Sequence, residues 1–236
     1  LKIIARVGVG TDGVDLNYAK NKNIKITYTP DAPGPAIAEL AIGFMYSLLR
    51  STHTANLQIR DGKWNRSIGR SFSDMTIGVI GAGRLGICFA LLCEAAGYDV
   101  LVSDIREDYV NDLNERKIKT HEPEVENLLK SAKNFRATTN NKEVIDECDL
   151  IYTLVATPSL EDGSYDVSAV WRVVTDFQDV TKRKYFVVGC TTNPGDCDNF
   201  RKQLPSNVKV FYNPEFIAQG SIINDLRTAD MVLLGA

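Results

Sequence analysis

The sequence predicts an α/β protein in which a small βαβ remnant and a long connecting helix precede a doubly wound parallel sheet. Apolar runs of strand length alternate with amphipathic helical stripes along the chain, as parallel βαβ units require. A glycine-rich turn at residues 81–86 joins one such run to a helix, and three later runs end in polar loops. Ligands of open parallel sheets bind outside the carboxyl ends of the strands, so a site is expected at these loops.

Three parts are expected along the chain. Residues 1–33 form the partial βαβ unit, residues 34–74 hold the long helix and a linker, and residues 75–236 form the sheet domain. Two strands alone cannot bury both of their faces, so the first part is expected to pack on a partner subunit or to have lost residues from its natural N-terminus. Its expected elements are strands over 2–7 and 24–28 and a helix over 16–21.

The long helix carries the broadest apolar stripe in the chain. The stripe consists of Ile37, Leu40, Ala41, Phe44, Met45, Leu48 and Leu49. Ile42 and Tyr46 widen it beyond what one neighbour covers, which predicts burial between lobes or between the subunits of a homodimer. A simple core helix is the alternative.

The sheet domain is expected to alternate strands with helices. The expected strands are 77–80, 100–102, 150–155, 185–189 and 208–212, and the expected helices are 85–96, 124–132 and 167–177. In the first of these helices the spacing of three and four predicts one buried face. That face consists of Leu85, Cys88, Phe89, Leu92, Cys93 and Ala96.

The turn Gly81-Ala82-Gly83-Arg84-Leu85-Gly86 has the spacing of a dinucleotide-binding loop. Gly81 permits the tight turn, Gly83 lets a pyrophosphate approach the backbone, and Gly86 lets the helix pack on the strand. The free N–H groups of the helix start, at Arg84 and Leu85, then bind phosphate. The interpretation is a Rossmann-type NAD-binding domain; a glycine-rich turn in an ordinary α/β protein is the alternative.

The second strand of this unit ends at Asp104, where an acid is expected to bind the adenosine ribose hydroxyls. Its neighbour Ile105 is expected to line the same site. A carboxylate repels the extra phosphate of NADP, so NAD is the expected cofactor. NADP remains the alternative cofactor, because groups such as Ser103 and Arg106 can bind a 2′-phosphate.

Composition excludes several classes of function. The 236 residues are 44% hydrophobic and 24% charged, with a net charge of -3. This charge leaves no electrostatic footprint for nucleic acid or an anionic membrane. The five cysteines form no CxxC pair, which indicates reduced thiols in a cytoplasmic protein without a metal site.

Residues 1–86 resemble the D-2-hydroxyacid dehydrogenases of the phosphoglycerate dehydrogenase type. The resemblance rests on RVGVGTDGVDL at 6–16, TPDAPGPAIAELAIGFMYSLLR at 29–50, DGKWNR at 61–66 and IGVIGAGRLG at 77–86. It implies that the backbone at Gly8, Val9 and Gly10 binds a substrate carboxylate and that the long helix forms a dimer. Glycines that merely turn the chain are the alternative. The histidine that this family uses as its acid and base is missing, because His53 and His121 stand elsewhere.

Residues 76–236 resemble the NAD-binding domain of the UDP-glucose/GDP-mannose dehydrogenases. The matching segments are HEPEVENLL at 121–129, VATPSLEDGSYDVSAV at 155–170, CTTNPGD at 190–196, YNPEFIAQGSIINDL at 212–226 and MVLLG at 231–235. The resemblance implies cofactor contacts at Val155, Ala156, Thr157 and Thr192, and a nucleotide-sugar pocket shaped by Asn213 and Glu215. Helix or turn capping by the two threonines is the alternative.

Three positions depart from this second family. Gln219 replaces a glutamate, Tyr109 replaces a basic residue and Cys190 replaces a lysine. The family's catalytic cysteine belongs to a later domain, and the sequence ends at Ala236 before it. Catalytic residues are therefore not assigned.

Two hypotheses about function follow. The first is an NAD-dependent oxidoreductase that acts on a CH–OH group of a small molecule, with a nucleotide sugar as the first substrate class and a 2-hydroxy acid as the second. The other is a catalytically silent NAD-binding dimerisation module, or a fragment.

Overall fold

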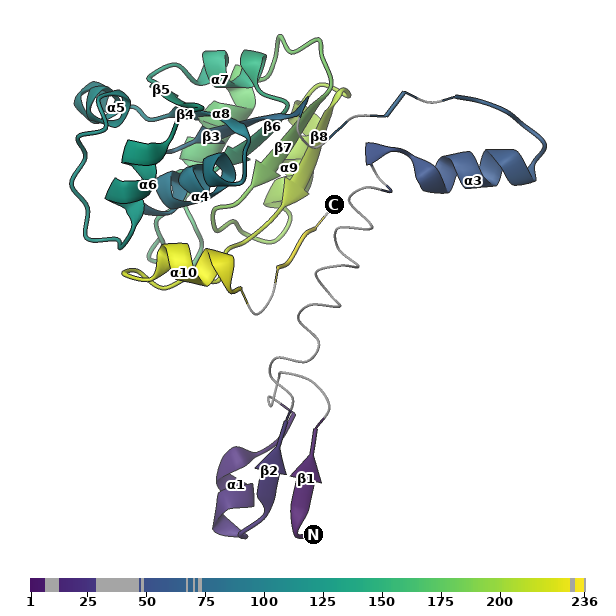
Figure 1. The fold of residues 1–236 in the computed structure, drawn as a ribbon, viewed down its shortest axis with the longest axis vertical. Coiled ribbons are helices and arrows are strands. Elements are labelled where there is room, and N and C mark those ends of the chain that lie inside the picture. Colours follow the sequence, from purple (N-terminus) through teal and green to yellow (C-terminus); the bar gives the residue numbers. More distant parts are fainter. Residues whose placement is uncertain are drawn as a thin grey trace. The chain divides into compact units, whose positions relative to one another are not determined.

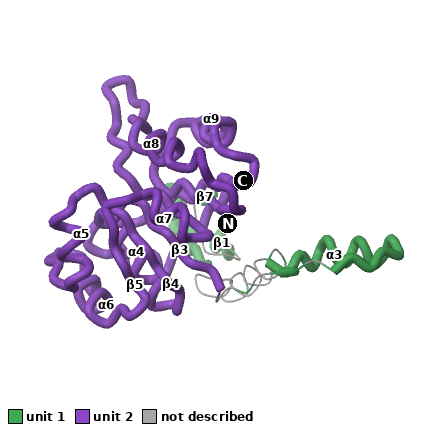
Figure 2. The backbone as a smooth tube through the Cα atoms, turned by 90° about the horizontal axis from the view of Figure 1, so that it is seen from above, with its two compact units in different colours: residues 1–72 green, residues 73–236 purple. Residues whose placement is uncertain are grey.

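The computed structural model describes residues 1–6, 13–28, 47, 49–66, 68, 69, 71, 74–229 and 232–235. The chain divides into two compact units, residues 1–72 and 73–236 (Figure 2). The expected substrate-side residues Gly8, Val9 and Gly10 lie outside the described residues, as does the expected helix over 37–49 apart from Ser47 and Leu49. Among the described residues, no helix is long and apolar enough to span a membrane.

The first unit contains the expected βαβ elements. Strands β1 (Ile3–Ala5) and β2 (Lys25–Thr27) pair in parallel, and α1 (Leu16–Asn21) connects them. Asp15 caps α1, because its carboxylate accepts the backbone N–H of Tyr18 at 2.8 Å. A further helix, α3 (Thr52–Arg60), follows. Among the described residues of this unit Ala19 alone is buried.

The second unit is a six-stranded parallel sheet with the order β5-β4-β3-β6-β7-β8 (Figure 1). Its strands are β3 (Thr76–Ile80), β4 (Asp99–Ser103), β5 (Phe135–Thr138), β6 (Leu150–Thr153), β7 (Lys184–Val188) and β8 (Val208–Tyr212). The chain winds outward from β3 to β5 and then returns to start the other half at β6. The order therefore reverses between β3 and β6, the position where doubly wound sheets open a ligand crevice.

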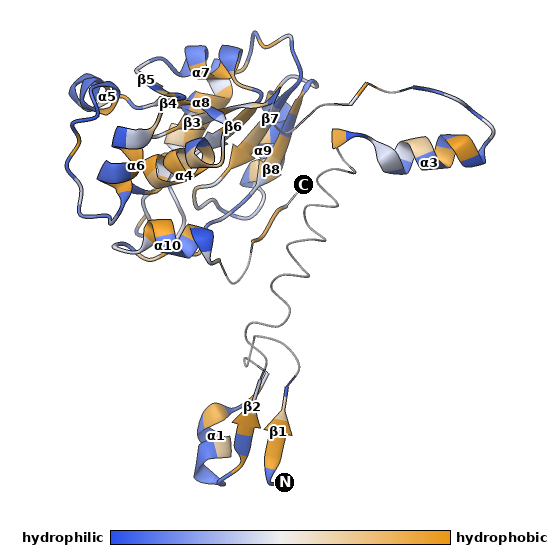
Figure 3. Ribbon diagram, viewed as in Figure 1, coloured by the Kyte–Doolittle hydropathy of each residue, from blue (hydrophilic) through white to orange (hydrophobic). Residues whose placement is uncertain are grey.

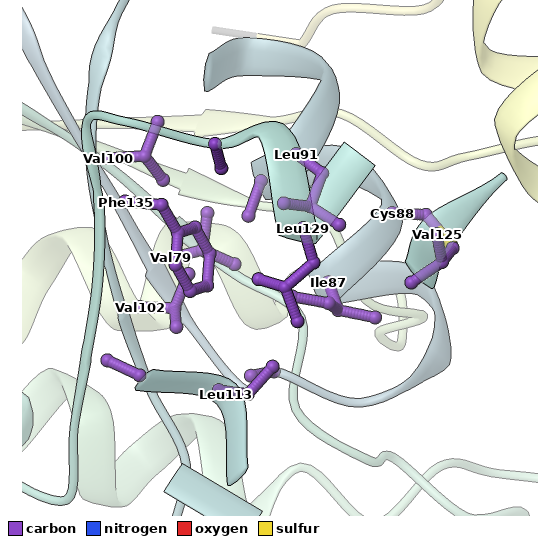
Figure 4. Packing of buried hydrophobic residues seen from close by; sticks show 14 of the residues in the cluster. Val79, Ile87, Cys88, Leu91, Val100, Val102, Leu113, Val125, Leu129 and Phe135 are labelled. Atoms are coloured by element: carbon purple, nitrogen blue, oxygen red, sulfur yellow. The ribbon is translucent and has the colours of Figure 1, made fainter. Parts of the chain in front are cut away.

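Helices cover both faces of this sheet. The cluster on one face joins β3, β4 and β5 to α4 (Arg84–Ala95), α5 (Glu107–Asn114), α6 (Val125–Ser131) and α10 (Ile222–Arg227); Figure 4 shows Val79, Leu91 and Phe135 packed within it. The cluster on the other face involves α7 (Asn141–Glu147), α8 (Ser168–Asp176) and α9 (Asp196–Gln203). The outer helices α5 and α7 are mostly hydrophilic (Figure 3). Two covered faces explain why the strand sequences read as continuous apolar runs.

The buried side of α4 differs from the expected stripe. Its buried residues are Gly86, Ile87, Cys88, Ala90 and Leu91, whereas Ala96 is exposed. Of the predicted face Cys88 is buried, and Leu85, Phe89, Leu92 and Cys93 are partly buried against the same core. The predicted face was too narrow because α4 is packed between the sheet and the two helices α6 and α10. A helix with neighbours on several sides buries a wider arc than one stripe.

Candidate functional site

Gly81 makes the turn that ends β3. Its φ is +97°, a left-handed conformation that favours glycine. A Cβ added there would lie 2.8 Å from the carbonyl oxygen of Leu154, just beyond β6, while the Gly81 N–H donates to the Ser103 carbonyl at 2.9 Å. The turn is therefore held between the ends of the two strands that flank β3, where a side chain would be both strained and obstructed.

Gly86 and Gly83 meet opposite steric conditions. A Cβ on Gly86 would lie 1.9 Å from the carbonyl oxygen of Gly81, so only glycine lets α4 pack this closely on the turn. Gly83, the N-cap of α4, has open space within 4 Å of its Cβ position and offers no side-chain cap. The first N–H groups of α4 therefore face space that a phosphate can enter. This arrangement fits the pyrophosphate of a dinucleotide.

A cleft of about 350 Å³ opens between the ends of β3 and β6. Six of the residues expected to bind a cofactor line it: Gly81, Gly83, Asp104, Ile105, Val155 and Ala156. Asn141 and Arg172, from the opposite face of the sheet, also line it, and no motif in the sequence pointed to them. We call this space the switch-point cleft.

Asp104 is bound by Arg106 in this cleft. Asp104 Oδ1 accepts the Arg106 backbone N–H at 3.1 Å and its Nε–H at 2.9 Å, and Oδ2 accepts Nη2–H at 3.1 Å. The hydrogen bond to Asp104 raises the pKa of the Arg106 guanidinium. The guanidinium also lies over the ring of Tyr109, 4.2 Å from its centroid. The carboxylate expected to bind ribose is thus already neutralised by a cation.

Ser103 does not take part in phosphate binding in this arrangement. Its side chain is buried, and its hydroxyl donates to Asn141 Oδ1 at 2.8 Å. Both groups that left NADP binding open line the cleft, but the Ser103 hydroxyl is buried and already donates to Asn141, whereas the Arg106 side chain is exposed.

A second cleft, of about 300 Å³, lies at the ends of β6, β7 and β8. The expected residues that line it are Leu85, Val155, Thr157 and Glu215, together with Cys190. Leu154 and Val155 also line the switch-point cleft, so the two spaces are neighbours along the carboxyl edge of the sheet. We call this second space the far cleft.

Glu215 and Cys190 are the titratable side chains in the far cleft. Partial burial raises the pKa of the Glu215 carboxyl above its ordinary value of 4.5. Burial raises the pKa of the Cys190 thiol to about 12, so this thiol stays protonated near neutral pH. Glu215 is therefore the group that can exchange a proton here, whereas Cys190 is a packed thiol.

Thr192 and Asn213 do not line either cleft. The neighbouring Thr191 lines the far cleft instead, while Thr192 contacts the thiol of Cys197. The Asn213 side chain is buried, donates to the Leu233 carbonyl at 2.9 Å and accepts from the Tyr152 hydroxyl at 3.3 Å. Its amide thus joins the end of β8 to the last described segment, which is a structural role.

A third cavity, of about 610 Å³, borders the start of α4 on the side of α5 and the loop before α6. Arg84, Arg106, Lys119 and His121 line it, and the Arg84 guanidinium donates to Gln219 Oε1. Of the residues that line it, the sequence predicted Gly83 and Arg84 as site residues. We call this space the α5–α6 cavity.

Glu122 fixes one wall of the α5–α6 cavity. Its carboxylate is buried and accepts the backbone N–H groups of Gly220 at 2.7 Å and Ile222 at 3.4 Å. The HEPEVENLL and QGSIINDL segments, about a hundred residues apart, are joined by these bonds. Because its carboxylate accepts hydrogen bonds from two backbone N–H groups at the start of α10, Glu122 has a structural role.

The fold, the glycine turn and the clefts define the second unit as a Rossmann-type dinucleotide-binding domain of the dehydrogenase class. Residues 75–236 match the UDP-glucose/GDP-mannose dehydrogenase family, NAD binding domain. The chain belongs to this family, and NAD is the cofactor of this domain.

Relatives from both expected families are found. The UDP-glucose 6-dehydrogenase AglM of Haloferax volcanii is 30% identical over 177 residues, which cover 69% of this chain and 41% of the relative. The hydroxypyruvate reductase of Thermotoga maritima is 39% identical over 106 residues, 44% of this chain and 35% of the relative. Both resemblances are confirmed, and the chain spans less than half the length of either relative.

A solved structure supports the same fold. In a crystal structure of a ternary complex, GDP-mannose dehydrogenase from Pseudomonas aeruginosa is 25% identical and aligns with a TM-score of 0.64. The match covers 68% of this chain and 41% of that chain. The predicted doubly wound sheet is confirmed.

Proposed function

We propose that this chain binds NAD along the switch-point and far clefts and supplies the cofactor-binding part of a nucleotide-sugar dehydrogenase. The observation that carries the proposal is the open start of α4 within the family-matched residues, where Gly83 lines the switch-point cleft and Leu85 lines the neighbouring far cleft. The family match and the relative AglM support the nucleotide sugar as the substrate class. A domain boundary near residue 75 belongs to the proposal.

Each cofactor-side residue has a defined task in this proposal. The backbone of Gly83, Arg84 and Leu85 binds the pyrophosphate, since these groups form the open start of α4. Gly81 and Gly86 shape the turn and Asp104 accepts a ribose hydroxyl, while Ile105 and Ala156 line the adenosine side. When bound, NAD supplies the acceptor for the hydride of the CH–OH carbon.

The far cleft is where the substrate carbon would lie. Thr157 and Thr191 line it beside Val155, and Glu215 brings a carboxylate of raised pKa. Oxidation of a CH–OH group releases the hydroxyl proton, and a carboxylate within hydrogen-bond reach can accept it. We assign this proton-accepting role to Glu215.

The proposal extends to assembly and location. A homodimer formed through residues 34–74 is the expected assembly, and light scattering tests it. A cytoplasmic location agrees with the five free cysteines, because thiols stay reduced in that compartment.

The second candidate is oxidation of a 2-hydroxy acid, which the hydroxypyruvate reductase relative favours. Here Gly8, Val9 and Gly10 would bind the substrate carboxylate. The discriminating experiment measures NADH absorbance with NAD and, in separate reactions, UDP-glucose, GDP-mannose or D-2-hydroxy acids. Turnover with a nucleotide sugar supports the first candidate, and turnover with hydroxy acids alone supports the second. Absence of turnover with all of these substrates, with NAD binding intact, overturns catalysis by this chain alone and favours a catalytically silent NAD-binding module. Absence of NAD binding overturns the proposal itself.

A further inference from the structure

The ion pair at the ribose site leaves little of the Asp104 carboxylate available. A carboxylate offers about four lone-pair positions, two on each oxygen. Arg106 occupies both positions on Oδ1 and one on Oδ2. One position on Oδ2 therefore remains, enough for a single ribose hydroxyl without breaking the pair.

The usual reason for NADP exclusion is thereby weakened. Discrimination against the 2′-phosphate depends on an unpaired carboxylate that repels it. Here the side chain of Asp104 is only 9% exposed and carries a guanidinium on its outer side. An approaching phosphate meets the cation before the carboxylate.

Arg106 keeps donors for such a phosphate. A guanidinium has five N–H groups, and the pair with Asp104 uses one on Nε and one on Nη2. Its side chain is 54% exposed, and the contact with Tyr109 holds its plane. A planar guanidinium with three remaining donors suits bidentate binding of phosphate oxygens.

The space beside Arg106 is also cationic. Arg106 and Gly83 line both the switch-point cleft and the α5–α6 cavity, so the two spaces meet at the guanidinium and at the start of α4. Arg84 and Lys119 add two further cations to the cavity, although Lys119 pairs with Glu126 at 3.2 Å. The one carboxylate among the residues that line this cavity is that of Glu122, which accepts hydrogen bonds from backbone N–H groups. About 610 Å³ is ample for a phosphate group and its water.

We propose that the α5–α6 cavity is a subsite for the 2′-phosphate of NADP(H), with Arg106 as the residue that determines specificity, so that the domain binds NADP(H) as well as NAD(H). This inference rests on the proposed dinucleotide site. It concerns only the adenosine end of the cofactor and is independent of the substrate class.

The test is a fluorescence titration of the full chain with NADH and with NADPH. We expect the Kd for NADPH to lie within about tenfold of that for NADH. Arg106→Gln removes the charged donors and leaves Asp104 unpaired, so it should weaken NADPH binding by about 10- to 100-fold while NADH changes less than about threefold. Competition by 2′,5′-ADP against 5′-AMP should show the same selectivity.

The matched control is Arg183→Gln. Arg183 also stacks on a tyrosine, Tyr185 at 5.2 Å, but lies at the β7 side of the sheet and lines neither the switch-point cleft nor the α5–α6 cavity. The Arg183→Gln variant removes the same charge as Arg106→Gln and should leave the affinities for NADH and NADPH unchanged. Thermal unfolding checks that each variant is folded.

Two results overturn the inference: an NADPH Kd more than about tenfold above that of NADH in the unaltered chain, or equal weakening of both nucleotides by Arg106→Gln. Absence of NADH binding is a different failure, because it overturns the proposed function itself.

Discussion

The two clefts treat a carboxylate in opposite ways. In the switch-point cleft Asp104 lies against the Arg106 guanidinium, which neutralises its charge. In the far cleft Glu215 is half-buried, and desolvation raises its pKa. Both acids follow the carboxyl ends of strands in one sheet, so their position in the fold is similar and only their neighbours differ.

This difference separates binding from proton transfer. An ion-paired carboxylate is held in place and can orient a hydroxyl group, whereas a desolvated carboxyl with a raised pKa can exchange protons nearer to neutral pH. Two acidic residues at the same edge of the sheet thus serve different tasks in the proposed function: Asp104 binds the cofactor and Glu215 accepts a proton. Variants at each end should have separable effects on cofactor binding and turnover.

The largest effect is expected from a change that blocks the backbone at the start of α4, where the switch-point cleft and the α5–α6 cavity meet. Gly83→Leu fills the open space at the start of α4 and should weaken NAD binding by at least about 100-fold, since phosphate can no longer approach the N–H groups. Its φ is -63°, so the backbone tolerates a side chain and the fold should persist. Calorimetric titration with NAD and a thermal melt measure the two effects; unchanged affinity would remove the α4 start from the site.

The next effect belongs to the far cleft. Glu215→Gln keeps the shape but removes the titratable proton, so turnover at saturating NAD and substrate should fall by about 10²- to 10⁴-fold. The Kd for NADH should change little, because Asp104 and the glycine turn are untouched. Initial rates as a function of pH measure this loss of turnover. A variant with full turnover would show that Glu215 does not accept the proton.

A smaller effect is expected at the switch-point cleft. Asp104→Asn removes one charge-assisted hydrogen bond to ribose and should raise the Kd for NADH by about tenfold, with turnover at saturating cofactor unaltered. The freed Arg106 should at the same time improve the Kd for NADPH. Fluorescence titration of both nucleotides decides the outcome, and an unaltered ratio of the two affinities would exclude Asp104 from the ribose site.

The smallest effect concerns stability. Glu215 has a higher pKa in the folded chain than the ordinary 4.5 of an unfolded one, so the folded state binds more protons above that pH. The free energy of unfolding should therefore decrease as pH rises from 4.5 through the raised pKa. Solvent reaches the carboxyl, so the change is small. Urea unfolding at several pH values should reveal it, and Glu215→Gln should abolish this part of the pH dependence.

Local signals predicted several elements to the residue. Helix α1 covers 16–21 because Asp15 caps it, and β8 covers 208–212 because its apolar run is bounded by polar residues. The short elements β5, α5, α7, α9 and α10 were not among the predictions. Helices α5, α7 and α9 carry few apolar residues, and β5 and α10 are only four and six residues long, so hydrophobic periodicity is weak in all five.

The doubly wound sheet, the glycine turn and the acid at Asp104 could be predicted from the amino-acid sequence, because each depends on residue type at short spacing. The tertiary structure decided which side chains reach a ligand. It brought Thr191 rather than Thr192 into the far cleft and used Asn213 to anchor the last segment. It also placed Arg106 on Asp104 and beside a cationic cavity. The walls of that cavity and the partners of Asn213 come from different loops that meet only when the strands align, so no spacing along the chain encodes them. Arg106 and Asp104 stand two residues apart in one loop, and there the fold decides only that the guanidinium binds the carboxylate.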